Sequence, residues 1–221
     1  MLGRLSPWQQ LGSVLLLVAA MVVLTVRTVP ATAFYERYLP WIIARSVGLT
    51  ALVLLTVLVS LGILLSHPLN RSTWRQTKEL LVWHRYLSVF VLALIAVHVL
   101  AIVLDKYAHV SIVGALVPGL AGYRVLPVAL GTVALYAFLI TASSASYAQK
   151  LPPKLWMGIH RWALVIFALA WTHGVLAGAD SASLRTLYLF LIAIVAASAA
   201  VRYWVLQQKS PPQSPKGDTT T

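Results

Sequence analysis

The sequence predicts an all-α integral membrane protein, built as a bundle of six helices. The first observation is composition: 60% of the 221 residues are hydrophobic, 10% are charged, and the mean hydropathy is +0.84. That is more apolar surface than a single globular core would bury, so an ordinary soluble domain is excluded. The second observation is that the apolar residues gather into segments of about 20 residues, which is the length that crosses a hydrocarbon core about 30 Å thick.

Six segments meet this length requirement, and in hydrocarbon each satisfies its backbone groups as a helix. They are residues 12–29, 42–66, 80–104, 124–145, 158–178 and 184–206. The first is followed by an Ala31-x-Ala33 pattern that a signal peptidase would recognise. Its apolar run is long for a signal peptide and Arg4 is its only early charge, so we expect it to be retained as a helix.

Two segments do not fit the pattern of membrane-spanning helices. Residues 110–122 are apolar but too short and too rich in glycine to span, so we expect them to lie on the outer face or to dip into it. Residues 207–221 contain three prolines and no apolar periodicity, which predicts a disordered tail. The chain is therefore divided into a first helix with its outer loop (1–40), a main membrane domain (41–206) and the tail.

Basic residues predict the orientation of the chain in the membrane. The 17 Lys and Arg residues exceed the 5 Asp and Glu residues, but they interrupt apolar spans and form no continuous patch, which argues against nucleic acid as a partner. One face carries Arg4, Arg71, Arg75, Lys78, Arg85, Lys150, Lys154, Arg161, Arg202, Lys209 and Lys216, and the other carries Arg27, Arg37, Arg45, Lys106, Arg124 and Arg185. The richer face holds both termini, so we expect a multi-pass protein of the plasma (inner) membrane with cytoplasmic termini.

Histidine is the only strong nitrogen ligand for a transition metal that the chain offers. It has no cysteine, which excludes disulfides, iron–sulfur clusters and thiolate-bound haem. Four of its six histidines lie inside two spans, as His84 and His98 in WHRYLSVFVLALIAVH and His160 and His173 in IHRWALVIFALAWTH. Ionisable residues inside a membrane are costly and usually functional, so these four are the candidate metal ligands.

Topology sorts the four histidines by depth. The third and fifth spans run in the same direction, so His84 and His160 share the cytoplasmic level while His98 and His173 share the outer level. Separations of 14 and 13 residues place the two levels about 20 Å apart at 1.5 Å per residue. A haem takes two axial nitrogens on opposite faces, so we interpret the pattern as two stacked bis-histidine haems between the third and fifth helices.

Helical rotation fits this interpretation unevenly. At about 100° per residue, 14 residues return to within about 40° of the starting face, whereas 13 leave a residual near 140°. The third span therefore fits easily and the fifth does not. Overwinding, tilt, or a different azimuth for each haem would absorb the difference, and Gly158 and Gly174 beside the ligands offer backbone freedom.

Two other uses of these histidines stay open, namely interhelical hydrogen bonding and a proton channel or transporter without haem. Proton relays commonly include carboxylates, but the acidic residues lie at helix ends, in loops or in the tail: Glu36, Glu79, Asp105, Asp180 and Asp218. His67 is interpreted as a helix-end residue. Asp105 and His109 would hold an external metal only if the helix continued between them, and we expect a solvated loop there.

An arginine follows each of the two cytoplasmic-level histidines. The repeats are His84-Arg85-Tyr86 and His160-Arg161-Trp162. Arg85 and Arg161 would contact haem propionates or the phosphate of a docked flavin through bidentate hydrogen bonds. The alternative is that they anchor the helices at the membrane boundary, and the sequence favours neither use.

With these motifs, residues from about 45 to 205 resemble the ferric reductase-like transmembrane domain found in ferric-chelate reductases and NADPH oxidases. The resemblance implies that the four histidines bind two b-type haems, which pass electrons outward from a cytoplasmic flavin. It also implies that the protein is the haem-binding membrane component of an oxidoreductase. The 13-residue spacing in the fifth span is shared by that family.

The chain departs from the larger members of the family because no FAD- or NAD(P)H-binding domain and no glycine-rich dinucleotide fingerprint follow its last helix. We therefore expect a separate flavoprotein or a membrane quinol as donor, with a flavin supplied or shared at the cytoplasmic face. Ferric chelate, oxygen and a periplasmic oxidoreductase are candidate acceptors. In size the chain is similar to the haem subunit of bacterial periplasmic methionine sulfoxide reductase, but that subfamily may lack the histidine equivalent to His84, so two haems are favoured here.

Overall fold

The structure is a computed structural model that describes residues 16, 20, 33–65 and 74–208. Within these residues every regular element is a helix. The first predicted span (12–29), His67 and the predicted tail (207–221) lie wholly or mostly outside the described residues.

Seven helices make up the described part of the chain. They are α2 (Ala33–Leu65), α3 (Trp74–Leu104), α4 (Ile112–Leu116), α5 (Val125–Ser146), α6 (Pro153–His160), α7 (Ala163–Ala177) and α8 (Arg185–Gln208). Five spans in this part are long and apolar enough to cross a membrane: Arg37–Leu65, Glu79–Leu104, Val125–Ser146, Pro153–Ala177 and Arg185–Trp204. The protein is therefore an integral, multi-pass membrane protein with a helical bundle, and five of the six predicted spans are seen.

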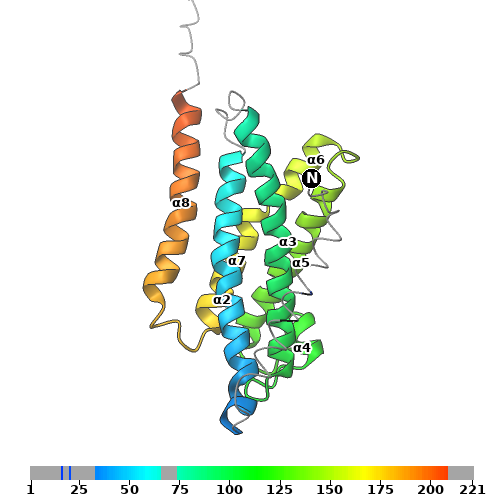
Figure 1. Ribbon diagram of the computed structural model, residues 1–221, viewed down its shortest axis with the longest axis vertical. Helices are drawn as coiled ribbons and strands as arrows, with labels where there is room; N and C mark the ends of the chain where they lie inside the picture. Colours follow the sequence, from blue (N-terminus) through cyan, green and yellow to red (C-terminus); the bar gives the residue numbers. More distant parts are fainter. Residues whose placement is uncertain (1–15, 17–19, 21–32, 66–73, 209–221) are drawn as a thin grey trace, which may run out of the picture.

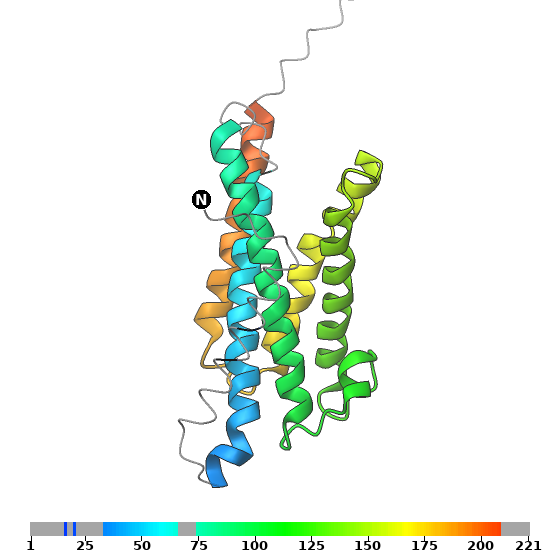
Figure 2. The ribbon, with the colours of Figure 1, turned by 45° about the vertical axis from the view of Figure 1, so that its right-hand side comes forward.

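Two antiparallel helix pairs form most of the bundle. The most extensive contacts join α2 to α3 and α5 to α7, and α8 packs on α2. Figures 1 and 2 show α3 descending beside α2 and α5 returning on the other side of the bundle, with α7 between α2 and α5. The two helices that carry His98 and His173, α3 and α7, thus belong to different pairs and face one another across the bundle.

Close packing joins the pairs into one bundle. A cluster of buried side chains links α2, α3, α5, α7 and α8, and it includes Leu55, Val59, Val91, Phe138, Ile166, Phe167, Tyr188 and Leu191. In lipid, the surrounding chains are as apolar as these residues, so the cluster stabilises the bundle mainly through van der Waals contact rather than through removal from water.

The short segment between α3 and α5 does not span the bundle, as its length predicts. It contains the five-residue helix α4, which lies at the end of the bundle where α3 finishes and α5 begins (Figure 1). Ser111 caps α4 by accepting a hydrogen bond from the Gly114 N–H at 3.0 Å. The hydroxyl of Thr132 donates to the carbonyl of Ala115 at 2.9 Å, so α4 is held against α5.

The fifth predicted span consists of two helices, α6 and α7, separated by a turn at Arg161 and Trp162. The Trp162 N–H donates to the Ile159 carbonyl at 3.1 Å, which is the i to i+3 pattern of a tightened helix. Such a turn advances about 120° per residue instead of about 100°, so it reduces the rotational misfit between His160 and His173. Local overwinding is thus present, and it falls at Arg161 and Trp162 rather than at Gly158 or Gly174.

Candidate functional site

The four candidate histidines meet across the bundle as two facing pairs. The ring centroids of His84 and His160 are 6.0 Å apart, and those of His98 and His173 are 6.2 Å apart. All four side chains are half-buried. Because α3 runs parallel to α6 and α7 (Figure 1), the first pair lies toward the α6 end of the bundle and the second toward the α4 end. The structure brings together the residues that depth paired in the sequence.

The distance within each pair suits a single metal ion between two imidazoles. A metal–imidazole bond is about 2.0 Å and the ring centroid lies roughly 1.2 Å behind the nitrogen, so two trans imidazoles have centroids roughly 6.3 Å apart. Both observed distances fall within a few tenths of an ångström of this value. In the described part of the chain no three His, Cys, Asp or Glu residues gather at one point. Two facing imidazoles are the protein ligands that a metal with its own equatorial ligands, such as haem iron, would require.

Backbone carbonyls orient both rings of the His98–His173 pair. His98 Nδ1 lies 2.7 Å from the carbonyl oxygen of Ala44, and His173 Nδ1 lies 2.8 Å from that of Pro127. A carbonyl only accepts, so each Nδ1 carries the proton and each Nε2 keeps a free lone pair. Metal-binding histidines commonly donate their second N–H in this way, which fixes the tautomer and the ring orientation.

The His84–His160 pair lacks these anchors. The Nδ1 atoms of both His84 and His160 are buried without a hydrogen-bond partner. Instead, the indole of Trp156 stacks on His160, with centroids 5.5 Å apart and planes inclined by 26°. The two levels thus resemble each other in ligand spacing and differ in the groups that hold the rings.

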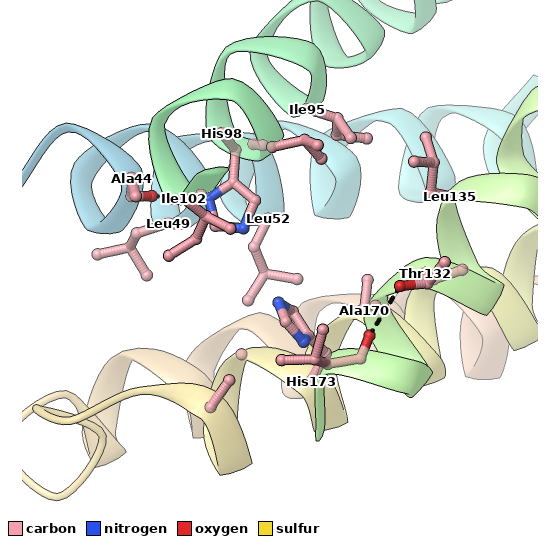
Figure 3. A pocket seen from close by; sticks show the side chains of 18 of the residues that line it. Ala44, Leu49, Leu52, Ile95, His98, Ile102, Thr132, Leu135, Ala170 and His173 are labelled. Atoms are coloured by element: carbon pink, nitrogen blue, oxygen red, sulfur yellow. Dashed lines mark hydrogen bonds between the residues drawn. The ribbon is translucent and has the colours of Figure 1, made fainter. Parts of the chain in front are cut away.

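A cavity of ≈ 190 Å³ lies around the His98–His173 pair. Figure 3 shows the two imidazoles directed toward each other across it. Its walls come from α2, α3, α5 and α7 and are mostly apolar, with Leu49, Leu52, Ile95, Ile102, Leu135 and Ala170 among them. A mostly apolar lining with a few polar groups is typical of cofactor pockets.

Two arginines that the sequence analysis did not single out hold the chain together at the α4 end. Arg45 on α2 lines the cavity and forms an ion pair with Asp180, which lies in the loop after α7. Arg124, directly before α5, donates to the carbonyls of Leu176 at 2.6 Å and Gly178 at 3.3 Å. In the sequence, both arginines stand out only because they lie on the membrane face that carries fewer basic residues.

Arg85 and Arg161 lie next to the ligands of the His84–His160 pair, and both are exposed. Asp105 and His109 lack the continuous helix that would place them one turn apart for a shared metal. The helix α3 ends at Leu104, and the buried Asp105 carboxylate accepts a hydrogen bond from the Ala108 N–H at 2.7 Å. The predicted loop is therefore present, although Asp105 within it is buried rather than solvated.

A helical membrane bundle with two facing histidine pairs, one above the other, is the arrangement expected of a membrane redox protein. Residues 47–171, more than half of the chain, match the family described as ferric reductase like transmembrane component, and the chain belongs to this family. The match contains His84, His98 and His160 and ends two residues before His173. No curated protein and no solved structure matches the chain. Membership supports a role in electron transfer within the membrane.

Proposed function

We propose that the protein is a transmembrane b-type cytochrome with two haems, one bound by His84 and His160 and the other by His98 and His173. The observation that carries this proposal is the presence of two separate levels at which two imidazoles face each other at the bis-histidine spacing. When bound, two six-coordinate haems would supply one-electron transfer between the two sides of the membrane.

The residues of the chain position and insulate these groups. The imidazoles would present Nε2 to the metal. At the α4 end the carbonyls of Ala44 and Pro127 accept hydrogen bonds from the Nδ1–H groups, which would raise the basicity of Nε2. The apolar lining of the cavity excludes water from the same level. The 14-residue separation along the continuous helix α3 sets the two levels about 20 Å apart.

The charge distribution supports electron flow from the α6 end toward the α4 end. By the positive-inside rule the α6 end would face the cytoplasm, so the His84–His160 level would be the electron entry side and the His98–His173 level the exit side. We propose a separate flavoprotein or a membrane quinol as donor. Arg85 and Arg161 are placed to contact haem propionates or a flavin phosphate there. Ferric chelate, oxygen and a periplasmic oxidoreductase are the candidate acceptors, so the protein would serve as the haem-binding component of an oxidoreductase.

The test is the haem content of the purified, full-length protein. A reduced-minus-oxidised absorption spectrum should show b-type bands, and a pyridine haemochrome assay should give two haems per chain. His84→Ala and His98→Ala should each remove one haem, whereas the exposed loop variant His109→Ala should retain both. Absence of b-type bands in the wild-type protein would refute the proposal, and proton flux in proteoliposomes would then favour the alternative, a histidine-based proton channel or transporter.

Electron paramagnetic resonance of the oxidised protein adds a signature for each level. The imidazole planes of His98 and His173 are inclined by 83°, and those of His84 and His160 by 61°. Near-perpendicular axial imidazoles give low-spin ferric haem a highly anisotropic signal. We expect two low-spin ferric signals, the more anisotropic of which disappears in His98→Ala. Loss of the other signal in that variant would contradict the assignment of the levels.

A further inference from the structure

Three of the four candidate ligands lie against a glycine on the neighbouring helix. A Cβ atom placed on Gly48 would lie 2.7 Å from Nδ1 of His98, and one placed on Gly131 would lie 2.8 Å from Nδ1 of His173. Real Cβ atoms essentially never lie within 3.0 Å of a non-bonded heavy atom. The imidazole rings of His98 and His173 can therefore occupy their positions only because Gly48 and Gly131 have no Cβ atom.

Each of these glycines lies four residues after the carbonyl that orients the same histidine. Gly48 follows Ala44 on α2, and Gly131 follows Pro127 on α5. In an α-helix the carbonyl of residue i points toward the N–H of residue i+4, so the side chain at i+4 lies beside that carbonyl. Without a Cβ at this position, an imidazole from the next helix can reach the carbonyl oxygen in the plane of its ring.

The same arrangement is incomplete at the other level. Gly62 also lies four residues after a carbonyl, that of Leu58, but its Cβ would be 3.3 Å from Cε1 of His84 and Nδ1 makes no hydrogen bond. His160 has the stacked Trp156 beside it in place of a glycine contact. Gly158, on the same helix as His160, has nothing within 4 Å of its would-be Cβ.

We propose that Gly48 and Gly131 are positioning residues that lock His98 and His173 as Nδ1–H tautomers with Nε2 directed at a shared haem iron. This inference rests on the proposed haem binding. Rings that are already oriented lose less freedom when the cofactor binds, so the His98–His173 level holds its haem more tightly than the His84–His160 level.

Four alanine variants of the full-length protein test the proposal, with haem per chain and the paramagnetic signals as readouts. Gly48→Ala and Gly131→Ala should weaken haem binding at the His98–His173 level about 10- to 100-fold, as loss of an outer partner of a metal ligand typically does. That level's signal should fade while the other is kept. Gly62→Ala should have a smaller effect, and Gly158→Ala should retain both haems. Alanine forms helix better than glycine, so helix propensity does not explain a loss.

A measurement without glycine variants keeps the inference testable if Gly48→Ala and Gly131→Ala do not fold. His84→Ala leaves only the His98–His173 haem and His98→Ala leaves only the other. Capture of haem by excess apomyoglobin should be at least about 10-fold slower from His84→Ala than from His98→Ala. Equal rates, or both signals unchanged in Gly48→Ala and Gly131→Ala, would overturn the inference and leave the proposed function standing. A wild-type protein without haem would overturn the proposed function itself.

Discussion

Replacing Arg124 by alanine should loosen the end of the bundle that carries His173. The Arg124 guanidinium donates to the carbonyls of Leu176 and Gly178, which close α7 and have no partner within the helix ladder beyond it. Leu176 lies three residues after His173, and Arg124 lies three residues before Pro127, whose carbonyl accepts the His173 Nδ1 proton. One side chain thus joins both segments on which the orientation of His173 depends.

The size of the effect follows from these two hydrogen bonds and the helix dipole. Hydrogen bonds from a charged donor contribute about 1.5–3 kcal/mol when well shielded, but the Arg124 side chain is exposed, which reduces this value. Its charge at the C-terminus of α7 adds about 0.3–1 kcal/mol. We expect Arg124→Ala to lower the free energy of unfolding by about 1–2 kcal/mol. At roughly 2–4 °C per kcal/mol for a chain of this length, the Tm falls by roughly 2–8 °C.

Thermal unfolding in detergent, followed by circular dichroism, measures this change against a matched control. Arg185→Ala removes the same exposed charge from the same predicted face, but Arg185 is the first residue of α8, where a cation opposes the helix dipole. Its Tm should stay unchanged or rise slightly. Arg124→Lys, which keeps the charge and loses the planar pair of donors, should fall between wild type and alanine. Equal Tm values for Arg124→Ala and Arg185→Ala would refute the reasoning.

Three further predictions use the same protein. Tyr188 is 4% exposed and its hydroxyl donates to the Gly174 carbonyl at 3.0 Å. Tyr188→Ala removes the packed ring as well as the hydrogen bond and should cost about 3–5 kcal/mol, whereas Tyr188→Phe should cost about 1 kcal/mol or less. Equal decreases in Tm for Tyr188→Ala and Tyr188→Phe would contradict this prediction. Asp180→Asn breaks the partly exposed ion pair with Arg45, so it should lower the free energy of unfolding by less than about 1 kcal/mol. This decrease should disappear at about 1 M salt, and a decrease that persists there would contradict the expected screening. Because the chain has no cysteine, a single introduced cysteine can report the orientation of the protein. Tyr107→Cys should react with an impermeant maleimide on intact cells, and Lys154→Cys should react only after lysis. The reverse pattern would show that the proposed orientation is wrong.

The sequence predicted the membrane helices and the pairing of the four histidines because both depend on properties that vary along one dimension. Hydrophobic length located the second to sixth spans, and the direction of the third and fifth spans was enough to match His84 with His160 and His98 with His173. The main difference is at α2, which begins at Ala33 rather than near residue 42. Its polar first turns continue the helix beyond the apolar segment, and hydropathy does not register them.

The groups that orient the ligands could not be predicted, because they come from helices that are distant in sequence. Ala44 lies 54 residues before His98, and Pro127 lies 46 residues before His173. Many glycines occur in the apolar spans, and nothing in their spacing shows which of them faces an imidazole. The same holds for Arg124, whose partners become apparent only when α5 and α7 are placed side by side.

The unequal spacing of the ligands has a structural counterpart in the two levels. At the α4 end, each ring is held by a carbonyl on the other helix of its own pair, so its azimuth is set by α2 or α5 and not by counting residues along α3 or α7. The residual rotation must then be taken up elsewhere. It falls on the turn at Arg161 and Trp162 and on the His84–His160 level, where no carbonyl holds either ring in a hydrogen bond. The number of residues between two histidines on one helix therefore determines how far apart they lie along the bundle. The backbone carbonyls of Ala44 and Pro127, each beside a glycine, determine the ring orientations of His98 and His173.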